Sequence, residues 1–547
     1  MFNHFKMKKS ILARLCFSLV LFVFYTHTAI GQTTLNVHFD TITFSGLPGL
    51  HSFAAAQYED KWLLIGGRKD GLHPKNGGFH TGSANQHIYV VQPSSGQVWQ
   101  RALAELPDTL REQLHSANME FCQWSDLLLF AGGYGRSEVI QDHRTYPYLT
   151  LIDVPELVSA VIDDTPLMPC FQQVRDTFFA VTGGQLQVMN DTFYLVGGHR
   201  FEGLYSSNAG TNNIQFYTDG IRKFTLEPDS LGWRPQRQSE IKDELNLHRR
   251  DYNLIPQIFA SGEAGLVAFS GVFQPGLALL PFLNIIEISP EGHAPVNDFS
   301  QFLANYHCAK VPLYAEAENS MHTLFFGGMS QYYLNENDSL IKDNRIPFVR
   351  TASRVSRLPD GTYEEVGFDA ELPFYTGSSA EFLLAHNIPV FSEGIVQLDE
   401  LADGETLLGY IVGGIVTAPD QPNPFINNVA NQTTASTRII RVFLQKNVPS
   451  ASPDLPLNGR TGLGMAVFPN PTSDVWNIQL TLPRNGDLML VLQNAQGQIV
   501  WQHKYGQFSA GASKLRLQAE AYPPGWYWLT ANVDGVFVET KRIAIIR

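Results

Sequence analysis

Charged residues are scarce in this chain. Asp, Glu, Lys and Arg together make up 16% of its 547 residues, whereas soluble globular domains usually contain roughly 25%. Cations are the scarcer kind, so the net charge at pH 7 is -14. Without clustered Lys and Arg side chains a protein cannot hold a phosphate backbone, which excludes nucleic acid as a partner. Glycine, phenylalanine and tyrosine are instead plentiful, and this composition favours an all-β fold.

Cysteine is equally rare, with four in the chain. Cys16 lies near the N-terminus, and the other three, Cys122, Cys170 and Cys308, show no CxxC spacing. An odd number of cysteines cannot pair completely within one chain. We therefore expect three buried free thiols that pack as small hydrophobic groups, in preference to a disulfide or a metal site.

Long apolar runs are absent except near the N-terminus. Residues 15–25 are apolar, they follow a basic start without carboxylates, and Ala29-Ile30-Gly31 offers small residues to a signal peptidase. This order predicts a signal peptide at residues 1–31; the alternative is a buried N-terminal helix. The run is too short to remain in a bilayer, so no transmembrane anchor is predicted.

A short unit recurs through the middle of the chain: an apolar strand that ends in two glycines. Clear examples are Trp62–Gly67 and Phe193–Gly198, whereas the fourth copy is degenerate because Ser270 replaces its first glycine. In each unit another strand comes before the glycine-ended strand, and a polar turn connects the two. Two further β-rich segments follow the glycine pair. Each unit therefore holds four strands, and the glycine pair ends the second. The second glycines of the six copies are Gly67, Gly133, Gly198, Gly271, Gly328 and Gly414.

Several units begin in a similar way. His51, His115 and His307 each open the strand before the glycine-ended one, and Gly183-Gly184 falls within the corresponding strand of the third unit. Converging imidazoles are common metal ligands. These histidines occupy equivalent positions of a repeat, however, so we interpret them as structural and predict no metal site.

These units resemble kelch repeats, and the resemblance implies a six-bladed kelch-type β-propeller over residues 32–446. In such a ring the glycine-ended strands are buried on both faces by neighbouring blades, and glycine permits the sharp exit that follows. Residues 34–40 are expected to pair with residues 437–443, which would complete the last blade and remove exposed sheet edges. An array of β-sandwiches is the alternative.

The chain ends in a second β-rich region. Residues 447–462 have the composition of a linker. Beyond it, Asn470-Pro471, a hairpin signal at residues 495–497, the strand that starts Gly525-Trp-Tyr527 and a basic-then-apolar end resemble the type IX secretion sorting domain of Bacteroidetes. The resemblance covers residues 463–547 and implies a small C-terminal β-sandwich. Composition alone supports only a small sandwich, such as a carbohydrate-binding or linker module.

The resemblance to a sorting domain also implies a route and a partner. The signal peptide would carry the chain across the inner membrane, and the type IX secretion machinery would recognise residues 463–547 at the outer membrane. The mature protein is therefore expected to be secreted or held on the outer cell surface.

In kelch propellers the loops after the glycine pairs and the starts of the first strands meet at one end of the central channel. Here those positions carry cations, carboxylates and aromatics, which suit a sugar or an acidic peptide. Most belong to the first three units, so the ligand contact is expected to be lopsided, with Arg250 reaching across the channel. For residues 249–252 a salt-bridged rim is the alternative. The predicted ligand-binding residues are Arg68, Tyr134, Arg136, His199, Arg200, Glu202, Tyr205, Arg250, Asp251 and Tyr252.

The function predicted from the sequence is binding of a glycan or protein ligand outside the cell. The Walker A, GxGxxG, HExxH and GxSxG signatures are absent, and no catalytic residue or cofactor is predicted. The alternative is a carbohydrate-active enzyme that resembles the kelch-type sialic acid mutarotases or galactose oxidase. Glu202 with Arg200 or Arg250 would suit the acid–base work of the first. The two Tyr, two His and one Cys that the second requires cannot be assigned.

Overall fold

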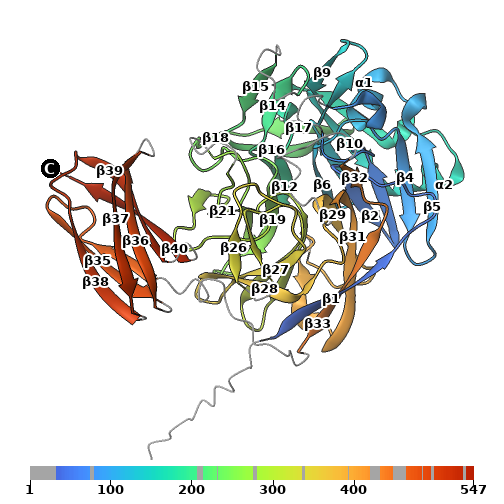
Figure 1. Ribbon diagram of the computed structural model, residues 1–547. Coiled ribbons are helices and arrows are strands. Elements are labelled where there is room, and N and C mark those ends of the chain that lie inside the picture. The colour runs from blue at the N-terminus through green and yellow to red at the C-terminus, as the bar shows by residue number, and fades with distance from the viewer. Residues whose placement is uncertain are drawn as a thin grey trace, which may run out of the picture. The chain divides into compact units, whose positions relative to one another are not determined.

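The computed structural model describes most of the chain between residues 33 and 546, and the described ranges are 33–73, 79–205, 213–230, 232–274, 280–335, 339–391, 393–418, 432–447, 464–482, 485–494, 498–509, 511–533 and 537–546. The predicted signal peptide, nearly all of the predicted linker and the hairpin signal at 495–497 lie outside these ranges. The fold is all-β, as predicted (Figure 1). In the described residues the α-helices are α1 (Asp108–Leu114) and α2 (Val154–Asp163). Neither they nor the single-turn 3-10 helices are long and apolar enough to cross a membrane.

Six sheets share one plan of four antiparallel strands, in which the second strand carries or precedes the glycine pair. The first sheet contains β2 (Ala54–Tyr58), β3 (Lys61–Ile65), β4 (His87–Gln92) and β5 (Gln97–Ala102). The second contains β6 (Glu120–Trp124), β7 (Leu127–Ala131), β10 (Tyr148–Asp153) and β11 (Phe171–Arg175). The third contains β12 (Gln185–Met189), β13 (Thr192–Val196), β16 (Gly220–Asp229) and β17 (Gly232–Arg237), with β18 (Ile241–Lys242) beside β16.

The other three sheets repeat this order. The fourth contains β19 (Asn253–Ile258), β20 (Ala264–Phe269), β21 (Ile286–Ser289) and β22 (Gly292–Pro295). The fifth contains β23 (Ala309–Ala315), β24 (Ser320–Phe326), β27 (Thr351–Arg357) and β28 (Tyr363–Glu371), with β30 (Val396–Gln397) beside β23. The sixth contains β29 (Ser378–Leu384), β31 (Gly404–Thr417), β33 (Ile439–Lys446) and β1 (Leu35–Ile42), with β32 (Thr433–Ala435) beside β31.

The N-terminal strand completes the last sheet, as the sequence predicts. β1 pairs antiparallel with β33, with Leu35 opposite Lys446 and Ile42 opposite Ile439. Figure 1 shows the blue β1 running beside the orange β33. The pairing gives β33 a partner on both sides, so the last repeat presents no unpaired edge there.

Apolar side chains fill the space between successive sheets. Full burial of one such side chain contributes about 1.5–3 kcal/mol. The last cluster joins the sixth sheet to the first, so the packing runs through all six sheets and returns to its start. Representative pairs in the six clusters are Leu63 and Phe130, Leu129 and Phe193, Val196 and Leu254, Val267 and Phe325, Phe326 and Ile411, and Val412 and Trp62.

Backbone hydrogen bonds connect the same six sheets at the glycine pairs. In every unit the N–H of the second glycine donates to a carbonyl that lies just before the next sheet. The donor–acceptor pairs are Gly67 to Ser116 (2.8 Å), Gly133 to Val181 (3.0 Å), Gly198 to Arg249 (2.7 Å), Gly271 to Asn305 (3.1 Å), Gly328 to Thr376 (2.9 Å) and Gly414 to Leu50 (2.8 Å). The glycine motif therefore ties each unit to its neighbour.

The loops after the glycine pairs of the second and third sheets build a further four-stranded sheet. Its order is β15 (Ile214–Tyr217), β14 (His199–Glu202), β9 (Asp142–Thr145) and β8 (Tyr134–Ser137). In the fifth unit the corresponding loop forms the hairpin of β25 (Tyr332–Leu334) and β26 (Leu340–Lys342). These strands carry aromatic and basic side chains shortly after the glycine pairs.

The C-terminal region contains two sheets that enclose one apolar core. One consists of β34 (Gly464–Phe468), β35 (Val475–Leu482) and β38 (Gly511–Gln518), and the other of β37 (Ile499–Phe508), β36 (Gly486–Asn494), β39 (Gly525–Val533) and β40 (Phe537–Ile545). Burial alternates along β35 and β36, as strands with one covered face require. Trp476, which is fully buried, lies in the shared core.

Two local expectations have clear outcomes. Cys122, Cys170 and Cys308 are buried and free, as predicted. The strand expected at His115 is wrong, because His115 caps the C-terminus of α1 and β6 begins at Glu120. Leu110 and Leu114 are four residues apart and both buried, a helical spacing that places both on one face.

Replacing Gly198 by Ala should destabilise the protein strongly. Gly198 has φ +73°, and a Cβ there would lie 2.6 Å from the backbone nitrogen of Gly184. Left-handed backbone costs a residue with a Cβ roughly 1–2 kcal/mol, and the clash adds to this cost. Gly394 is the matched control, because it has φ +76° and no atom near its Cβ position. Urea unfolding should show a loss for Gly198→Ala at least twice that for Gly394→Ala; equal losses would contradict the close approach.

Candidate functional site

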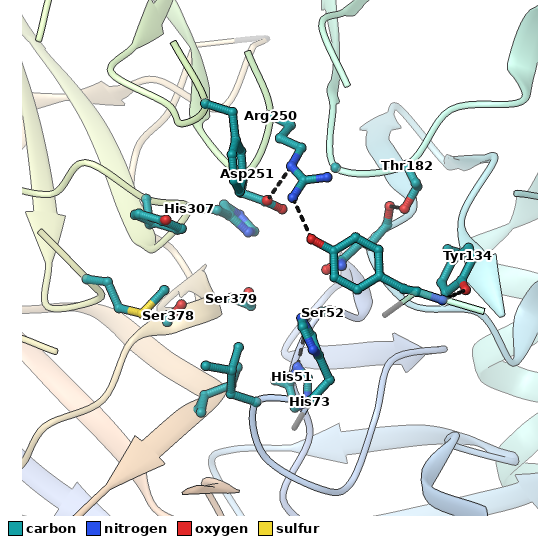
Figure 2. Close-up of a pocket in the computed structure, with 18 of the residues that line it drawn as sticks. His51, Ser52, His73, Tyr134, Thr182, Arg250, Asp251, His307, Ser378 and Ser379 are labelled. Carbon is teal, nitrogen blue, oxygen red and sulfur yellow. Dashed lines mark hydrogen bonds and ion pairs between the residues drawn. The ribbon is translucent and has the colours of Figure 1, made fainter. Parts of the chain in front are cut away.

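A cavity of about 390 Å³ lies where the first strands of the six sheets begin. Figure 2 shows its labelled side chains around a common space, with Arg250 and Asp251 on one side and His51 and His73 on the other. Ligand pockets have volumes of roughly 300–1,000 Å³. This cavity is near the lower limit, so it suits a small ligand.

Six backbone hydrogen bonds form a closed cycle around this cavity. Each residue donates its N–H to the carbonyl of the residue in the preceding unit, over distances of 2.8 to 3.2 Å. We call these residues the inner cycle: Ser52, Asn118, Gly183, Asp251, His307 and Ser379. All six also line the cavity.

The inner cycle requires an unusual backbone conformation. Ser52, Asn118, Asp251 and Ser379 have φ between 50° and 56°, and Gly183 has φ 69°. Residues with a Cβ rarely adopt this conformation, and Asn and Asp do so more readily than most. Such strain persists only where the surrounding structure enforces it and often marks a functional site.

Arg250 occupies one side of the cavity and is 6% exposed. Its Nη1 donates to Nδ1 of His199 at 2.9 Å, and its Nη2 donates to the hydroxyl of Tyr205 at 3.0 Å. Its Nε lies 3.5 Å from Oδ2 of Asp251. The ring of Phe273 covers one face of the guanidinium, with 3.9 Å between Cζ and the ring centroid. The guanidinium is therefore held from several sides.

His199 is neutral in this network. Its Nδ1 is 2.6 Å from Nε2 of Gln215 as well as 2.9 Å from Nη1 of Arg250. Both partners are donors, so Nδ1 must be an acceptor. Burial and the nearby Arg250 charge lower the pKa of His199 well below its usual value.

His307 is linked to a buried ion pair on the other side of Asp251. Its Nε2 lies 2.8 Å from Nζ of Lys310 and 3.2 Å from Oε1 of Glu381. Nζ of Lys310 and Oε2 of Glu381 are 3.5 Å apart. An ammonium group can only donate, so Nε2 of His307 accepts the hydrogen bond from Lys310.

His51 has a comparable arrangement. Its Nε2 lies 3.7 Å from Oδ1 of Asp70, and Asp70 forms a bidentate pair with Arg68 through contacts of 2.9 and 2.6 Å. Burial lowers the pKa of His51, in spite of Asp70. His51 is therefore a neutral group of the cavity wall.

Aromatic rings form much of the remaining wall. The hydroxyl of Tyr134 donates to the carbonyl of Gly203 at 2.6 Å and accepts from the backbone N–H of Tyr205 at 2.9 Å, which joins the two glycine loops. Phe79 packs edge to face against Tyr134 and Tyr205. Such walls give stacking surface at low conformational cost.

The structure separates the predicted ligand-binding residues into two groups. Tyr134, His199, Tyr205, Arg250 and Asp251 line the cavity.

The other five lie elsewhere. Arg68 is buried against Asp70, and Arg136 lines a separate cavity of about 190 Å³. Arg200 and Glu202 pair with each other at 2.7 Å. Tyr252 is fully buried, and its hydroxyl donates to the carbonyl of Val196.

Several cavity residues were not selected from the sequence. His51 and His307 were interpreted as structural, yet both line the cavity. Asn118, Ser378 and Ser379 were overlooked, although each sits at the start of a first strand, the position that led to Arg250 and Asp251. No group of three or more His, Cys, Asp or Glu is placed to hold a metal ion among the residues that the structure describes.

Replacing Asp70 by Asn should destabilise the protein at neutral pH. Although burial raises the pKa of Asp70, its contacts with His51 and Arg68 hold that pKa well below the usual value. A lowered pKa stabilises the fold above the unfolded value near 3.9, and this contribution is lost as the pH falls. We expect a loss of about 1.5–3 kcal/mol at pH 7 and a smaller one at pH 3.5, measured by urea unfolding. A loss that does not change with pH would contradict the ionic role of Asp70.

Three comparisons place the chain among known proteins. Residues 466–546 match the family model for a secretion system C-terminal sorting domain. No curated protein matches the sequence. A solved structure described as "Structure of YjhT" is 11% identical, with a TM-score of 0.40, and the match covers 72% of this chain and 99% of that one. The C-terminal region is therefore a sorting domain of the type IX secretion system, and it implies secretion or export to the cell surface.

Proposed function

We propose that this protein is a kelch-type β-propeller that is exported by its sorting domain. It binds a small ligand in the cavity of about 390 Å³ described above, which we call the central pocket. In this proposal residues 1–31 are a signal peptide, residues 32–446 form six blades, residues 447–462 are a linker and residues 463–547 are recognised by the type IX machinery. The mature protein acts outside the cell, either released or on the outer surface.

Three features support a closed ring of six blades. The glycine hydrogen bonds and the apolar clusters both run from each sheet to the next, and both return from the sixth sheet to the first. The inner cycle makes the same circuit with a different set of atoms. In a linear array of β-sandwiches the last unit would not contact the first.

The observation that carries the binding proposal is a group of polar side chains without partners inside the cavity. Within the described part of the chain, the side chains of Asn118, Ser378 and Ser379 make no hydrogen bond to the protein, yet all three line the cavity. Ser378 is buried and Asn118 and Ser379 are partly buried, and polar groups that are shielded from water normally have partners. A ligand with several hydroxyl groups would supply them, and the aromatic wall would stack on its apolar face. This favours a small glycan over an acidic peptide.

A carbohydrate-active enzyme is the second candidate. The observation that favours it is the contact of His307 with Glu381 and Lys310 beside Asp251. A histidine coupled to a carboxylate can accept and return a proton from a bound hydroxyl. Conversion of the bound sugar, followed by NMR, distinguishes this candidate from binding alone.

Replacing Arg250 by Gln should weaken binding of the sugars that the protein selects from a panel of mono- and disaccharides. Arg250 holds His199, Tyr205 and Asp251 in the cavity wall. Loss of such a charge-assisted contact costs roughly 1.5–3 kcal/mol, which is about tenfold or more in Kd when the wall that binds the sugar is disturbed. Arg350 is the matched control, because it pairs with Glu371 at 2.7 Å and does not line the cavity. Calorimetry should show normal affinity for Arg350→Gln. Equal affinity of both variants for the sugar would contradict the assignment of the binding site to this cavity.

Deleting residues 463–547 should leave the six sheets folded but abolish appearance at the cell surface. The strands of residues 464–545 pair with one another and share their own core, so the six sheets do not need them. In a host with the type IX system, the truncated protein should accumulate in the periplasm, measured by fractionation and immunoblotting. Surface display of the truncated protein would contradict the export proposal.

A further inference from the structure

Charged side chains around the central pocket occur as pairs of opposite sign. Two pairs lie at its wall and two lie behind His51 and His307. Each contains one cation and one carboxylate, so together these four pairs contribute no net charge to the pocket. The pairs are Arg250 and Asp251 (3.5 Å), Arg345 and Asp343 (2.7 Å), Arg68 and Asp70 (2.6 Å), and Lys310 and Glu381 (3.5 Å).

Two histidines of the cavity wall, His51 and His199, add no charge to these pairs. His51 and His199 are neutral, since burial lowers the pKa of both and a nearby arginine adds to the effect. An anionic ligand would therefore meet no uncompensated positive charge in this part of the wall. Burying an unpaired charge is costly, so the pocket is unfavourable for a carboxylate or a phosphate.

Arg250 is poorly placed to act as the counter-ion of a ligand. Its two terminal nitrogens already donate to His199 and Tyr205, and Phe273 covers one face. Bidentate binding of a carboxylate needs two parallel N–H donors on one edge. Each terminal nitrogen keeps one further N–H, but a ligand carboxylate that approaches Arg250 would also lie beside the carboxylate of Asp251, which is 3.5 Å from Nε. The two like charges would repel each other.

The polar groups left for a ligand are instead suited to hydroxyls. The Asn118 amide both donates and accepts, and so do the hydroxyls of Ser378 and Ser379. A sugar hydroxyl has the same double character. The Asp251 carboxylate adds a strong acceptor for such a hydroxyl, as long as the ligand itself is uncharged.

We infer that the pocket selects an uncharged, hydroxyl-rich ring of monosaccharide size, and that Asp251 determines this choice by compensating Arg250. The inference rests on the binding function proposed above and adds the class of ligand to it. Without Asp251 the same cavity has an uncompensated guanidinium and favours an anionic ring.

The test compares neutral hexoses with the hexuronates of the same stereochemistry, so that each pair differs mainly in charge. Glucose, galactose and mannose and their uronates are titrated against the full-length protein by calorimetry. The wild type should bind at least one hexose tenfold more tightly than its uronate. Asp251→Asn should shift that ratio at least tenfold towards the uronate. Asn tolerates the φ of 50° found at this position, and circular dichroism checks the fold.

Glu371→Gln is the matched control. It removes one carboxylate from a pair with Arg350 that does not line the cavity, so it changes the net charge equally and should keep the wild-type ratio. Tighter uronate binding by the wild type, or an unchanged ratio in Asp251→Asn, would overturn the inference while leaving pocket binding intact. If neither protein binds any of these sugars, the proposed monosaccharide site itself fails.

Discussion

The inner cycle is the interaction on which both the fold and the pocket depend. Each of its six residues donates one backbone hydrogen bond and accepts another, so the cycle is complete only when all six units are present. An unpaired N–H or carbonyl in the cavity wall would cost free energy. This requirement fixes the units relative to one another, and the apolar clusters between the sheets then supply most of the stability.

The same cycle explains which residue types line the cavity at these six positions. Its geometry places five of six positions in the left-handed region, where Gly, Asn and Asp are tolerated best. The chain has Asn118, Gly183 and Asp251 there, with serine at the two other left-handed positions. Small polar side chains are also the ones that hydrogen-bond a hydroxylated ligand. The backbone constraint and the binding chemistry therefore favour the same residues.

Features set by neighbouring residues could be predicted from the sequence, whereas contacts between distant units could not. The glycine-ended strands and the pairing of residues 34–40 with the last unit followed from local pattern and from the need to close an edge. The aromatic contact of Phe79 with Tyr205 joins loops of the first and third units, and no local pattern indicates it. Helix α2 was a missed local signal, since Val154, Leu157, Val158 and Val161 have helical spacing and Asp153 caps the first turn.

The sequence does contain the reason that Arg250 differs from the other predicted arginines. Arg68, Arg136 and Arg200 each have a carboxylate two residues later, at Asp70, Glu138 and Glu202. Arg200 and Glu202 lie within β14, where side chains two residues apart share a face, and the other two pairs form across a bend and a turn. All three pairs form within 3.0 Å. Arg250 is followed directly by Asp251, which adopts the left-handed conformation required by the inner cycle. The left-handed backbone at Asp251 keeps its carboxylate 3.5 Å from Nε of Arg250 and places both side chains at the cavity. The carboxylate therefore neutralises the guanidinium at the position where a ligand would bind.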